Sequence, residues 1–221
     1  MKAKDVKEIL VHSGVNYLYH VNTIATSLSY IKSGGLLSRQ TADDMGLPQT
    51  PQSSDETDKE FGVYNDIFFD SVDIHQRASR ANHYGPLMFV YSIDVLDTLE
   101  EYDICITKSN PMFWIRNMSY EDKYFTNSEN LFFEFARGNF SQHITIRDIS
   151  KPLPFEYLTE IVIENPGEKY SEFLHQAIEA LKNAGVEAPI VVRKCKDTCR
   201  CVTTYSGHKS GYVYHRFKTS C

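Results

Sequence analysis

The chain has 221 residues, enough for one domain with a substantial hydrophobic core. With 42% hydrophobic and 24% charged residues, the composition excludes a disordered or fibrous protein. No apolar run approaches the roughly 20 residues that span a bilayer, and MKAKDVKEIL lacks the apolar region of a signal peptide. We therefore expect a soluble, cytoplasmic protein with no membrane partner.

Charge is distributed unevenly along the chain. Residues 190–221 carry seven Lys and Arg residues and one acid, a net charge of +6, so the total of −6 leaves −12 for residues 1–189. A net acidic protein does not coat nucleic acid with its whole surface, whereas a basic segment can neutralise phosphates locally. We predict a domain over residues 1–189 and a basic C-terminal extension, containing Cys and Tyr, over residues 190–221.

The first 60 residues predict two helices, one strand and one long polar segment. A short amphipathic helix is expected over 4–12 and a strand over 16–21. Thr23 is a suitable N-cap for a helix over 23–32, which a glycine pair ends. Residues 38–60 are polar and nearly without apolar periodicity, which is typical of a lid, a binding loop or disorder.

Strands dominate the expected structure after residue 60. Residues 167–185 form the clearest helix, with apolar side chains on one face. Short apolar, aromatic or β-branched runs predict strands at 66–70, 86–93, 102–107, 142–148, 159–165, 188–194 and 212–217. Short strands with helices gathered early and late favour an α+β fold, and we find no Gly-rich phosphate loop.

Three groups of polar side chains could carry chemistry. His20 ends a strand just before a helix, where it could donate a hydrogen bond to a ligand or serve a structural role, and position alone favours the structural role. Arg77 lies in the basic stretch 73–84, and its guanidinium suits phosphate or carboxylate, although a solvated helix explains the stretch equally. Gln142 and His143 point to opposite faces of a strand, so one of them should face a cleft.

The C-terminal segment combines cysteines, aromatic residues and cations. Cys195, Cys199 and Cys201 have C-x3-C-x-C spacing, which is not a standard zinc motif, so we favour thiols in a reducing compartment and expect no metal. The aromatic residues could stack on unpaired bases or belong to a strand docked on the acidic body. We find no Ser-His-Asp, Cys-His, H-E-x-x-H or kinase pattern in the chain.

Several of these features occur in an order that resembles a known family. The run YLYHVNTIATSLSYIKSGGLLSR, residues 17–39, is similar to the opening of the DarT-type ADP-ribosyltransferases, which are toxins of DNA-modifying toxin–antitoxin pairs. Asp73, Ile74 and Arg77 resemble the D-I-x-x-R element of the family, and residues 142–163 resemble its late strand, proline turn and following strand. The resemblance covers roughly residues 15–165.

The resemblance implies an ADP-ribosyltransferase-like α+β fold, with two small mixed or antiparallel sheets flanked by helices around an NAD cleft. It implies that NAD donates ADP-ribose to a nucleobase of single-stranded DNA or RNA, in a toxin–antitoxin or phage-defence setting with an antitoxin partner. Arg77 would contact the NAD phosphates or activate the acceptor, and residues 38–60 would fold over NAD or substrate. His20 would hold the nicotinamide ribose or amide, and the NAD-binding residues would be His20, Asn22, Thr23, Leu37, Asp73 and Tyr84.

The chain departs from the family at its catalytic carboxylate. The late strand of the family carries a glutamate that stabilises oxocarbenium-like charge, and Gln142 stands at that place. Glutamine can bond to a ribose but cannot carry negative charge or take a proton. Either the glutamate has been replaced to make an inactive form, which we favour, or this is a natural variant, or Glu134 or another acid serves. The alternative function is a non-catalytic nucleic-acid- or protein-binding module on a degenerate transferase scaffold.

Overall fold

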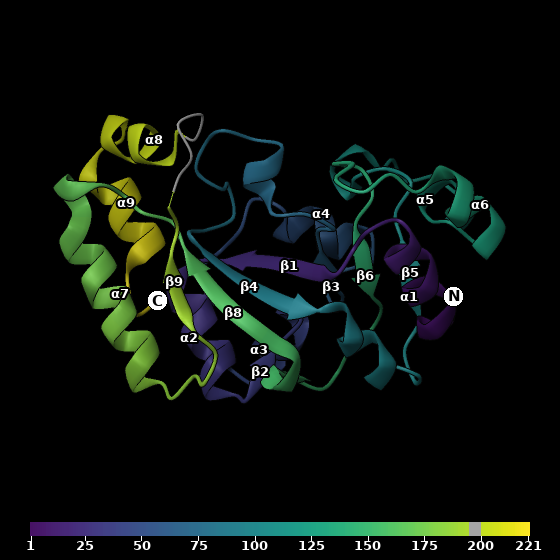
Figure 1. Cartoon of the computed structure of the whole chain (residues 1–221), viewed down its shortest axis with the longest axis horizontal. Helices are drawn as coiled ribbons and strands as arrows, with labels where there is room; N and C mark the ends of the chain where they lie inside the picture. Colours follow the sequence, from purple (N-terminus) through teal and green to yellow (C-terminus); the bar gives the residue numbers. More distant parts are fainter. Residues whose placement is uncertain (195–199) are drawn as a thin grey trace.

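A mixed four-stranded sheet forms the centre of the computed structural model, which describes residues 1–194 and 200–221. Its strands lie in the order β1 (Tyr17–Asn22), β4 (Leu87–Ser92), β8 (Leu158–Ile163) and β9 (Ile190–Val192). Neighbouring strands are antiparallel except β8 and β9, which are parallel (Figure 1). The side chains of β4 are buried on both faces, which accounts for its continuous apolar sequence.

A second sheet of three antiparallel strands lies beside the first. Its order is β3 (Ile67–Phe69), β6 (Ile144–Ile146) and β5 (Ile104–Ile106). A further pair joins β2 (Gly35–Leu36) to β7 (Leu153–Pro154). These small sheets, flanked by helices, agree with the predicted α+β class.

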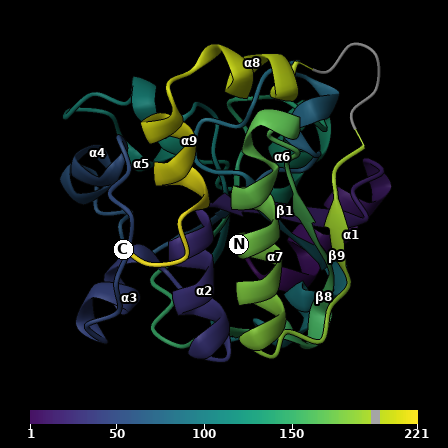
Figure 2. The same ribbon diagram turned by 90° about the vertical axis from the view of Figure 1, so that its left-hand side faces the viewer.

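The helices gather at the two ends of the molecule (Figures 1 and 2). At one end, α2 (Ile24–Lys32), α7 (Ser171–Asn183) and α9 (Ser210–Phe217) pack together beside α8 (Cys201–Gly207). At the other end, α1 (Ala3–His12) packs on α6 (Ser128–Glu134), near α5 (Tyr120–Lys123). The remaining short elements are α3 (Arg39–Asp44), α4 (Asp55–Glu60) and the 3-10 turns η1 (Ile74–Gln76), η2 (Ile93–Thr98), η3 (Pro111–Phe113), η4 (Phe155–Tyr157) and η5 (Glu168–Tyr170).

Most predicted elements are confirmed, and local signals explain them. Thr23 caps α2 by accepting a hydrogen bond from the backbone N–H of Thr26, as expected. Helix α7 buries Leu174, Ala177 and Leu181 on the one face that the sequence indicated.

Two expectations about local structure were wrong or incomplete. Residues 212–217 form part of helix α9 rather than a strand, because Val213, Arg216 and Phe217 are buried at helical i, i+3, i+4 spacing. Residues 38–60 are not irregular throughout, since they contain α3 and α4. Ser38 caps α3 by accepting a hydrogen bond from the backbone N–H of Thr41.

The basic C-terminal segment packs into the hydrophobic core of the acidic body. Strand β9 extends the central sheet, and Cys201, Tyr205, Val213 and Phe217 belong to the same buried cluster as the central strands. A separate function for residues 190–221 stays a prediction. Within residues 1–194 and 200–221, no helix is both long and apolar enough to cross a membrane.

A substitution at Gly35 tests the pairing of β2 with β7. Strand β2 directly precedes Leu37, which lines the cavity described below. A Cβ atom on residue 35 would lie 2.5 Å from the carbonyl oxygen of Leu153 and 2.8 Å from Cβ of Pro152. We expect Gly35→Ala to lower the free energy of unfolding by about 2 kcal/mol or more, measured by denaturant titration. Gly211→Ala in α9 is the control, because its Cβ would meet nothing within 4 Å and alanine favours a helix. Equal stability of the two variants would contradict this.

Candidate active site

A cavity of about 330 Å³ opens where the two main sheets meet. The backbones of Tyr19 in β1 and Asp70 after β3 exchange two hydrogen bonds, of 3.1 and 2.9 Å, and so join the sheets. The cavity walls come from β1, β3, the polar segment 38–60, the stretch 74–84 and the turn at 110–112. A volume of this size is typical of sites for small molecules.

His20 is held in one orientation on the cavity wall. Its Nδ1 lies 2.9 Å from the carbonyl oxygen of Phe68, which can only accept, so Nδ1 carries the proton. Nε2 is buried and has no hydrogen-bond partner among the described residues. Burial lowers the pKa of His20 to about 4, so the ring is neutral at pH 7. Nε2 is therefore an acceptor for a ligand hydroxyl or amide, rather than the donor expected from the sequence.

A cluster of ionisable side chains lines the same cavity and consists of Asp70, Arg77 and His143. One terminal nitrogen of Arg77, Nη2, donates to Oδ1 of Asp70 over 2.6 Å, and Nδ1 of His143 lies 3.8 Å from the same oxygen. The Phe140 ring lies 5.6 Å from the guanidinium carbon. Within residues 1–194 and 200–221, Nη1 of Arg77 has no partner, so it is positioned for an anionic ligand.

His143 completes this group through Asn110. The side-chain amide of Asn110 donates to Nε2 of His143 over 3.0 Å, which leaves the proton of a neutral ring on Nδ1, toward Asp70. Burial lowers the pKa of His143 and favours this neutral form. The carboxylate of Asp70 thus faces a cation on one side and a neutral donor on the other.

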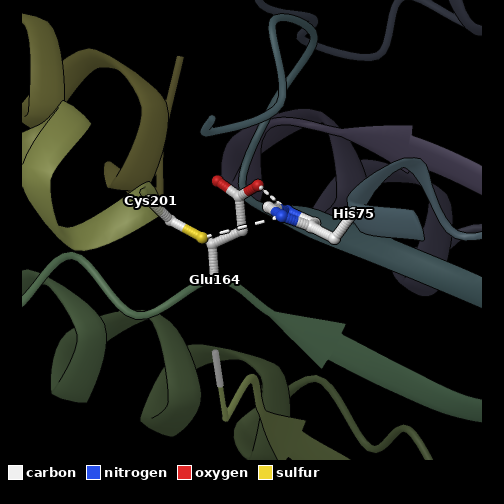
Figure 3. A group of neighbouring side chains, drawn as sticks. All are labelled: His75, Glu164 and Cys201. Atoms are coloured by element: carbon white, nitrogen blue, oxygen red, sulfur yellow. Dashed lines mark hydrogen bonds and ion pairs between the residues drawn. The ribbon is translucent and has the colours of Figure 1, made fainter. Parts of the chain in front are cut away.

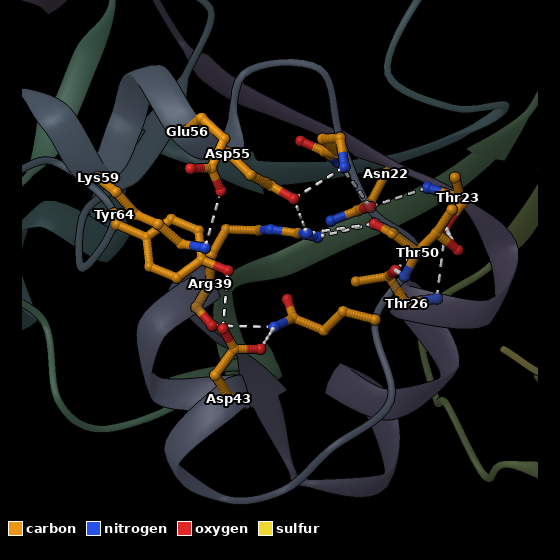
Figure 4. Close-up of polar contacts among 12 residues, drawn as sticks. Asn22, Thr23, Thr26, Arg39, Asp43, Thr50, Asp55, Glu56, Lys59 and Tyr64 are labelled. Atoms are coloured by element: carbon orange, nitrogen blue, oxygen red, sulfur yellow. Dashed lines mark hydrogen bonds and ion pairs between the residues drawn. The ribbon is translucent and has the colours of Figure 1, made fainter.

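Arg39 links distant parts of the polar segment 38–60 to one another, and Thr50 attaches the segment to the body (Figure 4). Its guanidinium donates to the carbonyl oxygen of Thr50 from two nitrogens at 3.2 Å and to Oδ2 of Asp55 at 2.7 Å. The hydroxyl of Thr50 in turn accepts from Thr23 at the start of α2. Both side chains of the Arg39–Asp55 pair are largely buried, so this ion pair is screened less than a surface pair. These contacts hold one wall of the cavity in place.

Three carboxylates line the cavity: Asp58, Asp66 and Asp70. Burial raises the pKa of Asp58 to about 6 and that of Asp66 to about 7. Asp66 is partnered by Arg147, whose Nε lies 3.0 Å from its Oδ2, and it accepts from the backbone N–H of Asp148. The cavity therefore contains carboxyl groups without any contribution from position 142.

The structure brings five of the predicted site residues to the cavity and leaves three away from it. His20, Asn22, Leu37, Arg77 and Tyr84 line it. Thr23 is used as the cap of α2. Asp73 caps η1 and forms an ion pair with Arg193 over 2.5 Å. The roles assigned to all eight residues stay predictions.

Gln142, the third residue away from the cavity, bonds to nearby backbone. Its Oε1 accepts from the N–H of Ala136 over 2.7 Å, and its Nε2 donates to the carbonyl oxygen of Glu134 over 3.0 Å. The neighbouring His143 lines the cavity instead. The strand expected over 142–148 begins only at Ile144, so Gln142 and His143 precede β6 and the predicted strand alternation does not apply to them. One of the two does face a cleft, and it is His143. Glu134, the other acid considered, is exposed and is not among the residues that line the cavity.

Sequence reasoning missed Asp58, Asp66, Asp70 and Asn110. The two acids at the ends of DIFFD were visible as polar residues that flank a buried strand, which is one available signal. Nothing in the sequence near Asp58 or Asn110 distinguishes them from the surrounding polar residues. Their place depends on how distant segments pack.

Three solved structures similar to this chain are complexes of DarT from Thermus sp. 2.9. The complex with ADP-ribosylated ssDNA has a TM-score of 0.52 and 11% sequence identity, over 84% of this chain and 97% of that one. This chain has the DarT fold. The complexes with NAD+ and with carba-NAD+ have TM-scores of 0.47 at 13% and 14% identity, over 84% of this chain and 98% of each of those. No protein-family model and no curated protein matches the sequence.

The likeness to DarT confirms the predicted fold class, the ADP-ribosyltransferase-like arrangement of small sheets and helices. At this low identity it shows the fold alone. The chemistry of the cavity has to be argued from its own residues.

Asp58 gives a test of the cavity's electrostatics. A carboxyl group whose pKa is raised from 3.8 to about 6 binds its proton more tightly in the folded state, so folding loses stability as the pH rises from about 4 to 6. We expect Asp58→Asn to raise the free energy of unfolding at pH 7 by about 2–3 kcal/mol, and by little at pH 4. Denaturant titrations at both pH values measure this difference.

Asp55→Asn is the matched control on the same helix. It removes the negative charge that pairs with the largely buried Arg39 guanidinium, so it should lower stability at pH 7. A stability gain in Asp58→Asn that does not change with pH would show that the Asp58 carboxyl is not the cause.

Proposed function

We propose that this chain is a mono-ADP-ribosyltransferase that transfers ADP-ribose from NAD to a nucleobase of single-stranded DNA. The observation that carries the proposal is the convergence of His20, Asp70, Arg77 and His143 on one cavity of a DarT fold. Thermus DarT supports the substrates, since it is known in complex with NAD+ and with ADP-ribosylated ssDNA. The sequence resemblance supports the same activity independently.

The cavity residues match the demands of this reaction. The bond between nicotinamide and C1′ of the ribose breaks, its electron pair leaves with nicotinamide, and a nucleobase atom bonds to C1′ and loses its proton. Asp70 would stabilise the positive charge that develops on the ribose, in the role for which the family uses a glutamate. Nε2 of His20 would accept a hydrogen bond from a ribose hydroxyl or from the amide, and Nη1 of Arg77 would contact phosphate.

Exposed side chains beside the cavity suit an unpaired nucleic-acid strand. Tyr84, Met112 and Phe140 line the cavity while 40%, 62% and 46% exposed. Phe113 lies next to Met112 and is 59% exposed. Aromatic faces stack on bases of any sequence, so this rim fits single-stranded acceptors better than duplexes.

The basic extension over residues 190–221 is proposed to help hold the acceptor strand or an antitoxin. Lys194, Arg200 and Lys209 are exposed and could neutralise phosphates. Arg193 and Arg216 are already engaged, by Asp73 and by the carbonyl oxygens of Asn82 and His83. A toxin–antitoxin or phage-defence setting in the cytoplasm is proposed from the sequence resemblance.

Labelled NAD tests the activity. The chain is incubated with labelled NAD and single-stranded DNA, duplex DNA, RNA or protein, and the label on each acceptor is counted. We expect labelled single-stranded DNA, and a rate about 10²–10³-fold lower for Asp70→Asn and for Arg77→Ala. Asp97→Asn and Arg116→Ala, at exposed ion pairs elsewhere, should leave the rate unchanged.

The other outcomes of this assay separate the alternatives. Label on RNA alone would make RNA the acceptor. The non-catalytic binding module would be favoured if the chain binds single-stranded nucleic acid but labels no acceptor. The same result would be required of the Gln142→Glu variant.

The Gln142→Glu variant tests which position supplies the catalytic carboxylate. Either Asp70 supplies it, or position 142 does and the present chain is an inactive form. A glutamate at 142 keeps the acceptor for Ala136 but loses the donor to the carbonyl oxygen of Glu134, and two acceptors then face each other. We expect the free energy of unfolding to fall by about 1–3 kcal/mol and the transferase rate not to rise. A rate gain of several orders of magnitude would instead assign the catalytic carboxylate to position 142.

A further inference from the structure

A buried cluster outside the cavity brings together His75, Glu164 and Cys201 (Figure 3). His75 lies in η1, Glu164 follows β8, and Cys201 begins α8, so three distant segments meet here. The exposed fractions are 0% for Cys201 and 3% for Glu164. One potential ligand atom from each residue lies within 4.8 Å of the others.

Glu164 fixes the ring of His75. Its Oε1 lies 2.7 Å from Nε2 of His75 and accepts from the backbone N–H of Asn82 over 2.8 Å. Its Oε2 accepts from the hydroxyl of Tyr205. Because a carboxylate accepts at both oxygens, Nε2 of a neutral His75 carries the proton, and Nδ1 presents its lone pair toward Cys201. Metal-binding histidines are oriented by a carboxylate in this way.

The spacing of nitrogen and sulfur fits a shared metal ion. Nδ1 of His75 and Sγ of Cys201 are 3.8 Å apart. Zinc bonds of about 2.3 Å to sulfur and about 2.0 Å to nitrogen, at a tetrahedral angle, place these two atoms about 3.5 Å apart. A thiolate and an imidazole are ligands that zinc prefers.

We propose that Nδ1 of His75 and Sγ of Cys201 bind a structural zinc ion, with Glu164 as the residue that positions the imidazole. Zinc takes four ligands in structural sites, and these two side chains supply half of them. The thiols predicted from the sequence at Cys195 and Cys199 lie outside the described residues, and the proposed site does not include them. The site would tie α8 to the stretch that carries Arg77, two residues after His75, and so brace one wall of the cavity.

Metal content and cobalt absorption test this site in the full-length chain. Protein expressed with added zinc and purified without chelator should hold about one zinc ion per chain, as in four-coordinate structural sites. Cobalt in place of zinc should give thiolate-to-metal charge-transfer absorption. A chelator should lower the melting temperature, and added zinc should restore it.

Variants identify the ligands independently of transferase activity. Cys201→Ser and His75→Ala should each weaken cobalt binding at least tenfold, and Glu164→Gln by about 10–100-fold. Cys105→Ser and Cys221→Ser are the matched thiol controls and should bind cobalt like the wild type. Circular dichroism checks that each variant is folded, and the chelator experiment on the wild type needs no variant.

Two results would overturn the proposal. One is wild-type protein that holds no zinc, shows no charge-transfer absorption with cobalt and melts at the same temperature with chelator. The other is folded Cys201→Ser or His75→Ala protein with wild-type cobalt affinity. In the first case the cluster is a thiol–imidazole contact without a metal.

Discussion

The backbone bridge between Tyr19 and Asp70 determines where the site lies. Its two hydrogen bonds join β1, an edge strand of the four-stranded sheet, to the residue that follows β3, an edge strand of the three-stranded sheet. The residue after Tyr19 is His20, so the bridge sets His20 and the Asp70 side chain beside each other on one cavity. The bond from Nδ1 of His20 to the Phe68 carbonyl oxygen tightens the same junction. Sheet pairing thus orients the candidate catalytic groups directly.

The cavity combines ion pairs that stabilise the fold with carboxyl groups whose burial lowers its stability. Arg39 and Asp55 pair in a largely buried environment, and Arg77 pairs with Asp70. Asp58, in contrast, is held at a raised pKa by burial. Burial disfavours the charged form of a carboxyl group, and such perturbed pKa values are common in active sites.

Long-range contacts also explain why the C-terminal segment is difficult to interpret from composition. Its charge suggested a surface extension, yet β9, Tyr205 and Phe217 belong to the central sheet and core. Residues on the buried side of α8 and α9 serve packing, while the exposed Lys and Arg side chains remain available to a polyanion. The same segment therefore supports the fold and can carry a binding surface.

The sequence by itself determined the α+β class, helix α7, most strands and the candidates His20 and Arg77. These follow from local periodicity, from caps and from motifs within a few residues. Only the tertiary structure decided that His143 rather than Gln142 faces the cavity, because both residues lie before β6, where no strand alternation orients them. It also decided the meeting of His75 with Cys201, because that contact depends on packing between segments that are far apart in the chain. The pairing of Asp70 with Arg77, which are close in sequence, depends on the path of the backbone between them.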